Sequence, residues 1–154
     1  MRTLFSLLAM VLLAACVTTG GGGAVNEIHL FGMPVVANLD SKPGADGFAV
    51  RVYITKSGNA KGASVRQGVV EILMFDGVAG GADLSAAAPT QTWKFSASEL
   101  SRFEEITSLG HGYKFALPWT NPPKSQHITV VARYLPVKGE PLYSAPSAIS
   151  TVVK

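Results

Sequence analysis

The chain has 154 residues, and its 13 lysines and arginines against 10 aspartates and glutamates give a formal net charge of +3. The basic residues are scattered and form no run, so the sequence contains no basic stretch of the kind that binds nucleic acid or anionic lipid. We expect no nucleic-acid partner. The single cysteine, Cys16, excludes a disulfide within the chain, so that packing and backbone pairing must stabilise the fold.

The N-terminal residues have the layout of a secretory signal peptide. Arg2 supplies a positive charge, residues 4–13 contain no charged side chain, and the small residues Ala14 and Ala15 follow. The apolar stretch is shorter than the roughly 20 residues that a membrane-spanning helix requires. The sequence therefore predicts a signal peptide over residues 1–15.

The segment Leu13-Ala14-Ala15-Cys16 resembles the lipobox of bacterial lipoproteins. The resemblance implies lipidation of Cys16, which would become the N-terminus and carry diacylglycerol and usually an amide-linked fatty acid such as palmitate. Two or three acyl chains would make the attachment stable. In bacteria with two membranes, an aspartate after the cysteine commonly retains a lipoprotein in the inner membrane. Val17 occupies that position here, which favours the outer membrane, facing the periplasm.

An ordinary secretion signal, cleaved near Ala15, is the alternative to lipidation. It would leave Cys16 as a free thiol with no partner in the chain. In either case a glycine-rich segment with four glycines, residues 20–23, follows the cysteine and behaves as a flexible coil. We expect residues 16–26, the lipidated cysteine and its tether, to hold a domain over residues 27–154 within about 40 Å of the membrane.

Alternation of apolar and polar residues predicts the strands of this domain. The period of two is clearest at Phe48, Val50, Val52 and Ile54, which indicates a strand with one buried face. Residues 69–75 are apolar at nearly every position except Glu71 and predict a strand covered on both faces. An edge strand is predicted around Ile28 and Leu30. Further strands are predicted at residues 91–95, 113–117, 128–134, 142–144 and 148–153.

One helix is predicted after Ser96. Ser96 and Glu99 have the spacing of a capping box, in which each side chain accepts a hydrogen bond from the other residue's free amide. The side chains expected to face the core are Leu100, Phe103 and Ile106. The glycines expected to mark the end of the helix are Gly110 and Gly112.

Seven or eight short strands, without alternating long helices, predict an all-β antiparallel sandwich with one short helical insertion. The stretch from His127 to Val153 resembles the last hairpin of fibronectin type III and immunoglobulin-like modules. The likeness lies in a strand that ends in a tyrosine, a turn at Lys138-Gly139, and Ser144-Ala145-Pro146 before the final strand. It implies an immunoglobulin-like arrangement of the strands.

The sequence names no catalytic site. No G-x-S-x-G pattern marks the nucleophile of an α/β hydrolase. His111 lies between two glycines shortly after Glu104 and Glu105, which could orient its imidazole as a general base. No nucleophile accompanies it, and a turn residue is the simpler interpretation. We expect no catalytic residues, and a hydrolase that uses His111 is an alternative.

No metal or cofactor is expected. The three histidines, His29, His111 and His127, have no spacing typical of a zinc site. Asn38, Asp40 and Asp46 bring oxygen atoms into one loop, as calcium requires, but tight loops use the same residue types. Ion binding by this loop stays open.

Trp119 is a candidate for a residue of a recognition surface. It continues the alternation from Leu117 and precedes the loop Asn121-Pro122-Pro123. A core aromatic and an aromatic at a recognition surface are not separated by the pattern alone. Both interpretations stay open.

Together these features predict a lipid-anchored protein of the cell envelope that acts as a binding or scaffolding module and not as an enzyme. Its partner would be an envelope protein or a polysaccharide. The segments Asn38-Leu39-Asp40, Val50-Arg51-Val52-Tyr53 and Val130-Val131-Ala132-Arg133-Tyr134 resemble the sandwich lipoprotein of the type VI secretion system. This resemblance implies, as the alternative, an accessory lipoprotein of an envelope-spanning secretion system. The strand at residues 69–75 has no counterpart in that comparison.

Overall fold

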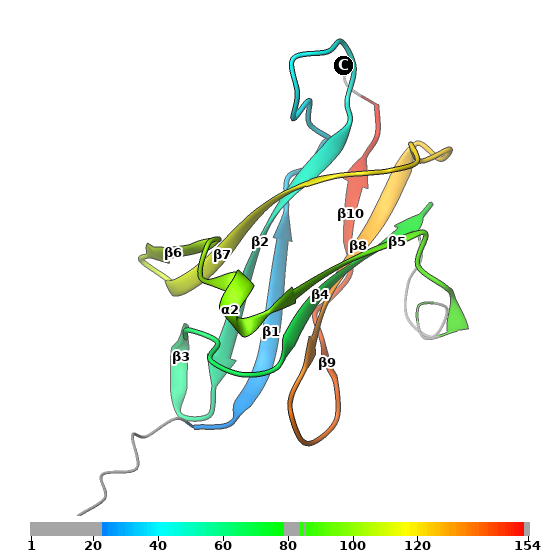
Figure 1. Cartoon of the computed structure of the whole chain (residues 1–154). Helices are drawn as coiled ribbons and strands as arrows, with labels where there is room; N and C mark the ends of the chain where they lie inside the picture. The colour runs from blue at the N-terminus through cyan, green and yellow to red at the C-terminus, as the bar shows by residue number, and fades with distance from the viewer. Residues whose placement is uncertain (1–22, 79–83, 85, 153–154) are drawn as a thin grey trace, which may run out of the picture.

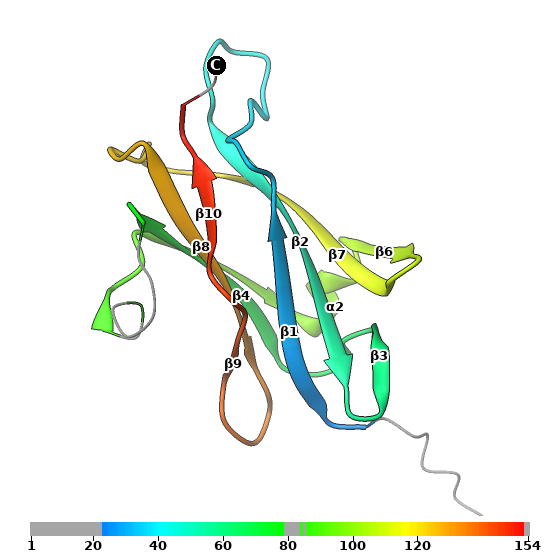
Figure 2. The same cartoon turned by 180° about the vertical axis from the view of Figure 1, so that it is seen from behind.

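The computed structural model describes residues 23–78, 84 and 86–152, and two β-sheets face each other in this part of the chain (Figure 1, Figure 2). The predicted all-β sandwich with one short helix is confirmed. The helix is α2 (Ala97–Leu100). The strands are β1 (Val25–Gly32), β2 (Gly47–Lys56), β3 (Asn59–Gly62), β4 (Val69–Asp76), β5 (Gln91–Ser96), β6 (Glu104–Thr107), β7 (Gly110–Pro118), β8 (His127–Leu135), β9 (Leu142–Tyr143) and β10 (Ser147–Ser150).

The first sheet contains β1, β2, β7 and β6 in this order, with the short β3 paired to the ends of β2 and β7. The second sheet has the order β10-β8-β4-β5, and β9 pairs with β8. All these pairings are antiparallel except a single parallel bridge between Gly62 and Gly110. Among the described strands β1 pairs with β2 alone, which confirms the predicted edge position.

The main core lies between the two sheets and is built by the predicted alternation. Phe48, Val52 and Ile54 of β2 are fully buried, and their neighbours in sequence point to the other side of the sheet. Their partners across the core come mainly from β4 and β8, while Leu100 of α2 closes one side. Burial of each such side chain contributes about 1.5–3 kcal/mol to the folded state.

Strand β4 is covered on both faces, as its apolar sequence predicts. Val70, Ile72 and Met74 point into the main core. Leu73 and Phe75 form a second buried cluster with Val131 of β8 on the outer face, and Leu84 packs against this cluster. The outer face of the second sheet is therefore partly apolar.

The predicted helix is present but shorter than expected. The capping box forms, with the Ser96 amide donating to Oε2 of Glu99 at 2.8 Å, and Leu100 is buried. The helix ends at Leu100, however, and Ile106 lies on β6 with 82% of its surface exposed. Gly110, at a φ of 95°, follows the turn between β6 and β7 instead of ending a helix. The prediction that Ile106 faces the core is wrong. Residues 104–107 pair with β7 as a strand at the edge of the sheet and do not continue the helix.

Tyr53 departs from the simple alternation of β2. It points away from the main core, yet only 5% of its surface is exposed. Its ring lies across Gly112 of β7, where a Cβ atom would come within 2.7 Å of the ring. The hydroxyl is 3.2 Å from Oγ1 of Thr107, and Phe31 packs edge-on at 5.8 Å. A glycine on the neighbouring strand thus provides the space for an aromatic side chain on the outer face.

Two short strands differ from the sequence-based prediction in smaller ways. Strand β3 was not predicted, because its four residues are polar or small and show no alternation. The last strand ends at Ser150, before the predicted limit of 153, and residue 153 lies outside the described residues.

Candidate functional site

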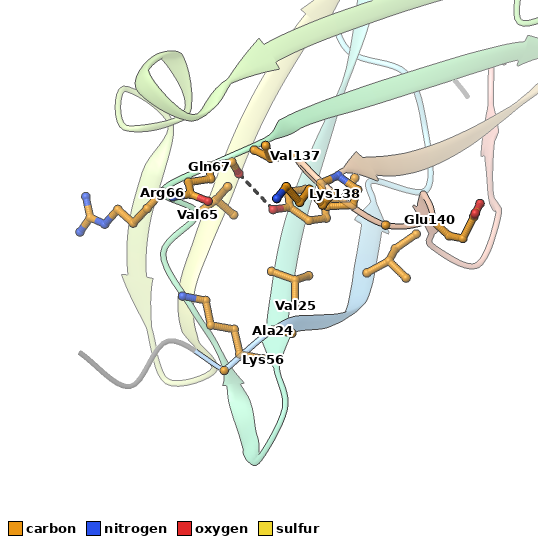
Figure 3. A pocket seen from close by; sticks show the side chains of 14 residues that line it. Ala24, Val25, Lys56, Val65, Arg66, Gln67, Val137, Lys138 and Glu140 are labelled. Atoms are coloured by element: carbon orange, nitrogen blue, oxygen red, sulfur yellow. Dashed lines mark hydrogen bonds between the residues drawn. The ribbon is translucent and has the colours of Figure 1, made fainter. Parts of the chain in front are cut away.

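A hollow of about 780 Å³ opens at the end of the sandwich where β1 begins, and we call it the end hollow (Figure 3). Its lining comes from residues 23–25, Lys56, residues 65–67, Tyr134, residues 136–140 and Leu142. The β2–β3 and β8–β9 connections lie at this end, and the loop between β1 and β2 lies at the opposite end (Figure 1, Figure 2). The first described residue, Gly23, therefore lies at the hollow itself.

Two tyrosine hydroxyls position the segment that leads into β4. Tyr134 donates to the carbonyl oxygen of Gln67 at 3.0 Å (Figure 3), and the amide of Val65 donates to the Tyr113 hydroxyl at 2.6 Å. Burial raises the pKa of the Tyr134 hydroxyl above its ordinary value of 10.0, still further from neutral pH, where a tyrosine hydroxyl is protonated in any case. Hydrogen bonds with two tyrosines of the main core thus position the part of the wall formed by residues 65–67.

The end hollow carries more positive than negative charge. Lys56, Arg66 and Lys138 contribute cations and Glu140 the one carboxylate of the lining. The ion pairs formed by the described residues include none of these four groups. Figure 3 shows Arg66 and Glu140 pointing outward on opposite sides. Lys56 ends β2, Arg66 lies between β3 and β4, and Lys138 lies between β8 and β9, so that only the fold places them around one hollow.

The structure brings His111 close to Glu104, one of the two neighbouring glutamates that could orient its imidazole. Residues Ile106 and His111 are paired between β6 and β7, and Nδ1 of His111 lies 3.0 Å from Oε1 of Glu104. The His111 side chain is 40% exposed. Among the described residues its ring hydrogen-bonds with Glu104 alone. Glu105 turns to the other face and pairs with Arg51 at 2.9 Å.

The side chains of the loop between β1 and β2 are used in its own hydrogen bonds. Oδ1 of Asp46 accepts from the Leu39 amide at 2.6 Å, and Oδ1 of Asp40 accepts from the Lys42 amide at 2.8 Å. Asn38 donates to the carbonyl of Lys42 and accepts from the Asp40 amide. Within residues 23–78, 84 and 86–152, no three His, Cys, Asp or Glu side chains are placed to hold a metal ion. The loop-forming role explains these residue types.

Trp119 belongs to the edge of the core. Its side chain is half-buried and packs against the main cluster, and its amide donates to the carbonyl of Asp46 at 3.0 Å. Trp93 of β5 packs edge-on against Phe48 at 5.3 Å and is likewise partly buried. These contacts favour the core interpretation of Trp119.

An ion-pair cluster on the outer face of the second sheet was not predicted. Glu71 of β4 lies opposite Arg133 of β8 and Lys94 of β5, and only 1% of its surface is exposed. Oε1 is 3.0 Å from Nζ of Lys94, and Oε2 accepts from Nε of Arg133 at 2.6 Å. The Arg133 guanidinium also lies 5.8 Å from the centre of the Tyr143 ring. In the sequence, a glutamate within an otherwise apolar strand is the one signal of this cluster. Its partners could not be predicted, because they depend on how β4 pairs with β5 and β8.

No model of a known protein family matches the chain, and no curated protein or solved structure matches it either. The class that the fold defines is an all-β sandwich. Cys16, the predicted lipidation residue, lies outside the described residues. Within the described part of the chain, no helix combines the length and apolar character needed to cross a membrane.

Proposed function

We propose that this protein is a lipid-anchored component of the cell envelope that binds or scaffolds another envelope molecule and is not an enzyme. The proposed anchor is Cys16, on the outer membrane facing the periplasm, and the glycine-rich residues 20–23 connect it to the sandwich. The observation that supports the proposal is the position of Gly23 in the lining of the end hollow, because the glycine-rich residues 20–23 join Cys16 to this end of the sandwich. The partner is an envelope protein or a polysaccharide.

The Cys16→Ser variant tests the anchor. In a bacterium that processes lipoproteins, we expect the variant to lose incorporation of labelled fatty acid and to leave the lipid-anchored membrane fraction, because the serine hydroxyl does not replace the thiol that accepts diacylglycerol. Fatty-acid labelling and fractionation measure both effects. Val17→Asp is the matched variant: it keeps Cys16, so labelling should remain while the protein moves to the inner membrane. Unchanged labelling of Cys16→Ser would contradict the proposed anchor.

A hydrolase that uses His111 is the second candidate, favoured by the contact between His111 and Glu104. A carboxylate that fixes the ring through Nδ1 leaves Nε2 to act as a general base. If a hydrolytic activity is found, His111→Ala should abolish it and leave the melting temperature unchanged, and that result would overturn the binding proposal. Glu105→Gln is the control, since this carboxylate contacts Arg51 instead.

An accessory role in an envelope-spanning secretion system remains the alternative among binding functions. The residues of that resemblance lie in the loop between β1 and β2, on β2 and on β8. Crosslinking of the anchored protein in intact cells, followed by mass spectrometry of the captured molecules, distinguishes the accessory role from a general scaffolding function. Capture of secretion-machine components supports the accessory role, and capture of other envelope proteins or of a polysaccharide supports the general scaffold.

A further inference from the structure

We infer that the end of the sandwich around the end hollow lies on the bilayer and binds the headgroups of anionic phospholipids. The surface in question carries Lys56, Arg66, Val137 and Lys138, and we call it the basic face. The inference rests on the proposed lipid anchor. It adds a second attachment, made by the folded domain itself, and an orientation of the domain on the membrane.

The length of the chain before Gly23 restricts where the basic face can be. Seven residues, 16–22, connect the proposed anchor to Gly23, and they extend to about 25 Å at most. Since Gly23 lines the end hollow, the basic face stays within a few Debye lengths of the membrane, where one Debye length is about 8 Å at physiological salt.

The charges of the basic face suit an anionic surface. Lys56, Arg66 and Lys138 outnumber Glu140, and the ion pairs within the described residues leave all three cations available. The side chains of Arg66 and Lys138 are exposed and that of Lys56 is half-buried. Long cationic side chains can lay their apolar stems along a membrane surface and keep the charge among the phosphates. Phosphate oxygens are therefore the chemistry that this face would recognise.

An apolar side chain protrudes from the same face. Val137 lies between Pro136 and Lys138 in the loop that joins β8 to β9, and 70% of its surface is exposed. An exposed valine flanked by a lysine has no role in the core, but it can enter the boundary between headgroups and acyl chains. The opposite end of the sandwich differs, since its loop between β1 and β2 carries Asp40 and Asp46 against Lys42. The end that begins at Gly23 combines surplus positive charge with a protruding apolar residue.

A fluorophore on the processed, lipidated protein tests this orientation. In the proposed anchor the Cys16 sulfur is a thioether, so that Val137→Cys introduces the one thiol available for a polarity-sensitive label. The labelled protein is inserted into vesicles of phosphatidylcholine with or without phosphatidylglycerol, and quenching by brominated lipid reports contact with the bilayer. We expect a blue shift and strong quenching with phosphatidylglycerol. A label at Ser41→Cys, in the loop at the far end, should show neither.

Charge variants separate lipid binding from simple proximity. Joint replacement of Lys56, Arg66 and Lys138 by glutamine should abolish the quenching at position 137. Salt at about 1 M should have the same effect, because the Debye length then falls to about 3 Å. Replacement of the exposed Lys42, Lys114 and Lys124 by glutamine removes the same charge elsewhere and should leave the quenching unchanged.

Four contrary outcomes are distinguishable. Protein that does not float with the vesicles contradicts the anchor and this inference together. Protein that floats while its label at position 137 remains in water leaves the anchor intact and overturns the orientation. Equal quenching in both types of vesicle overturns the assignment to anionic headgroups. Binding of inorganic phosphate to the basic face, with the label at position 137 in water in both types of vesicle, would assign the face to a soluble anion and overturn the membrane contact.

Discussion

The Phe115→Ala variant is expected to lose about 3–5 kcal/mol of the free energy of unfolding. Phe115 lies on β7 and is fully buried. Its ring stacks on Phe95 at 4.6 Å and packs on Phe103 at 4.9 Å, while Phe95 and Phe103 are 5.1 Å apart. Truncation removes two of these three aromatic contacts, each worth about 0.5–1.5 kcal/mol beyond area burial, and leaves a cavity between the sheets.

This loss is large for a domain of this size, whose total stability is of order 5–15 kcal/mol. Denaturant titration of the detergent-solubilised protein, followed by the fluorescence of its two tryptophans, measures the change. Phe31→Ala is the control, because Phe31 is 56% exposed and makes one edge contact with Tyr53, so about 1 kcal/mol is expected. Equal losses in the two variants would contradict the placement of the core.

The Glu71→Gln variant is expected to lose about 2 kcal/mol, less than the roughly 3–5 kcal/mol of a fully buried pair. Glutamine keeps the shape of the side chain but leaves the charges of Arg133 and Lys94 without their carboxylate. The loss is moderated because the Lys94 side chain is 69% and the Arg133 side chain 29% exposed, so water compensates in part. Denaturant titration at pH 7 measures it.

Glu105→Gln is the matched control for Glu71→Gln. Its carboxylate forms one ion pair, with Arg51 at 2.9 Å, and both side chains are at least one-third exposed. Such surface pairs contribute about 0–1 kcal/mol. If Glu105→Gln lowered the free energy of unfolding as much as Glu71→Gln, burial would not explain the contribution of the Glu71 cluster to stability.

The stabilisation by Glu71 should depend on pH. Burial alone raises the pKa of the Glu71 carboxyl, but hydrogen bonds from Lys94 and Arg133 and their positive charges outweigh it, so that the pKa lies below its ordinary value of 4.5. A group whose pKa is lowered by folding stabilises the protein above its unfolded pKa and loses that contribution as the pH falls through the folded pKa. The advantage over Glu71→Gln should therefore be complete at pH 7 and shrink below about pH 4.5.

Most strands could be predicted because their signal is local. In β2 and β8 every second residue is apolar, as it is in β7 from Tyr113 onwards, and a pleated strand turns these residues to one face whatever its neighbours are. The capping box of α2 is local too, since Ser96 and Glu99 contact each other within one turn. Strand β6 could not be predicted in this way, because Ile106 suits a helix face as well as a strand until the pairing with β7 is known.

The contents of the candidate site were less predictable. The His111–Glu104 contact was anticipated from residue types seven positions apart, and a short hairpin is enough to create it. The end hollow was not anticipated, since Lys56 ends β2, Arg66 lies between β3 and β4, and Lys138 lies between β8 and β9, and only the folded sandwich places them around one hollow. The Glu71 cluster likewise required the register of three strands.

By itself the sequence determined the all-β class, the positions of the main strands, the one capped helix turn and the prediction of a lipid anchor at Cys16. These depend on periodicity or on residues adjacent in the chain. The tertiary structure alone decided the strand order, the burial of Tyr53 over Gly112, the ion pairs of Glu71 and the gathering of cations beside Gly23. The physical reason is that each of these joins residues distant in sequence, whose proximity follows from how the two sheets pair and pack.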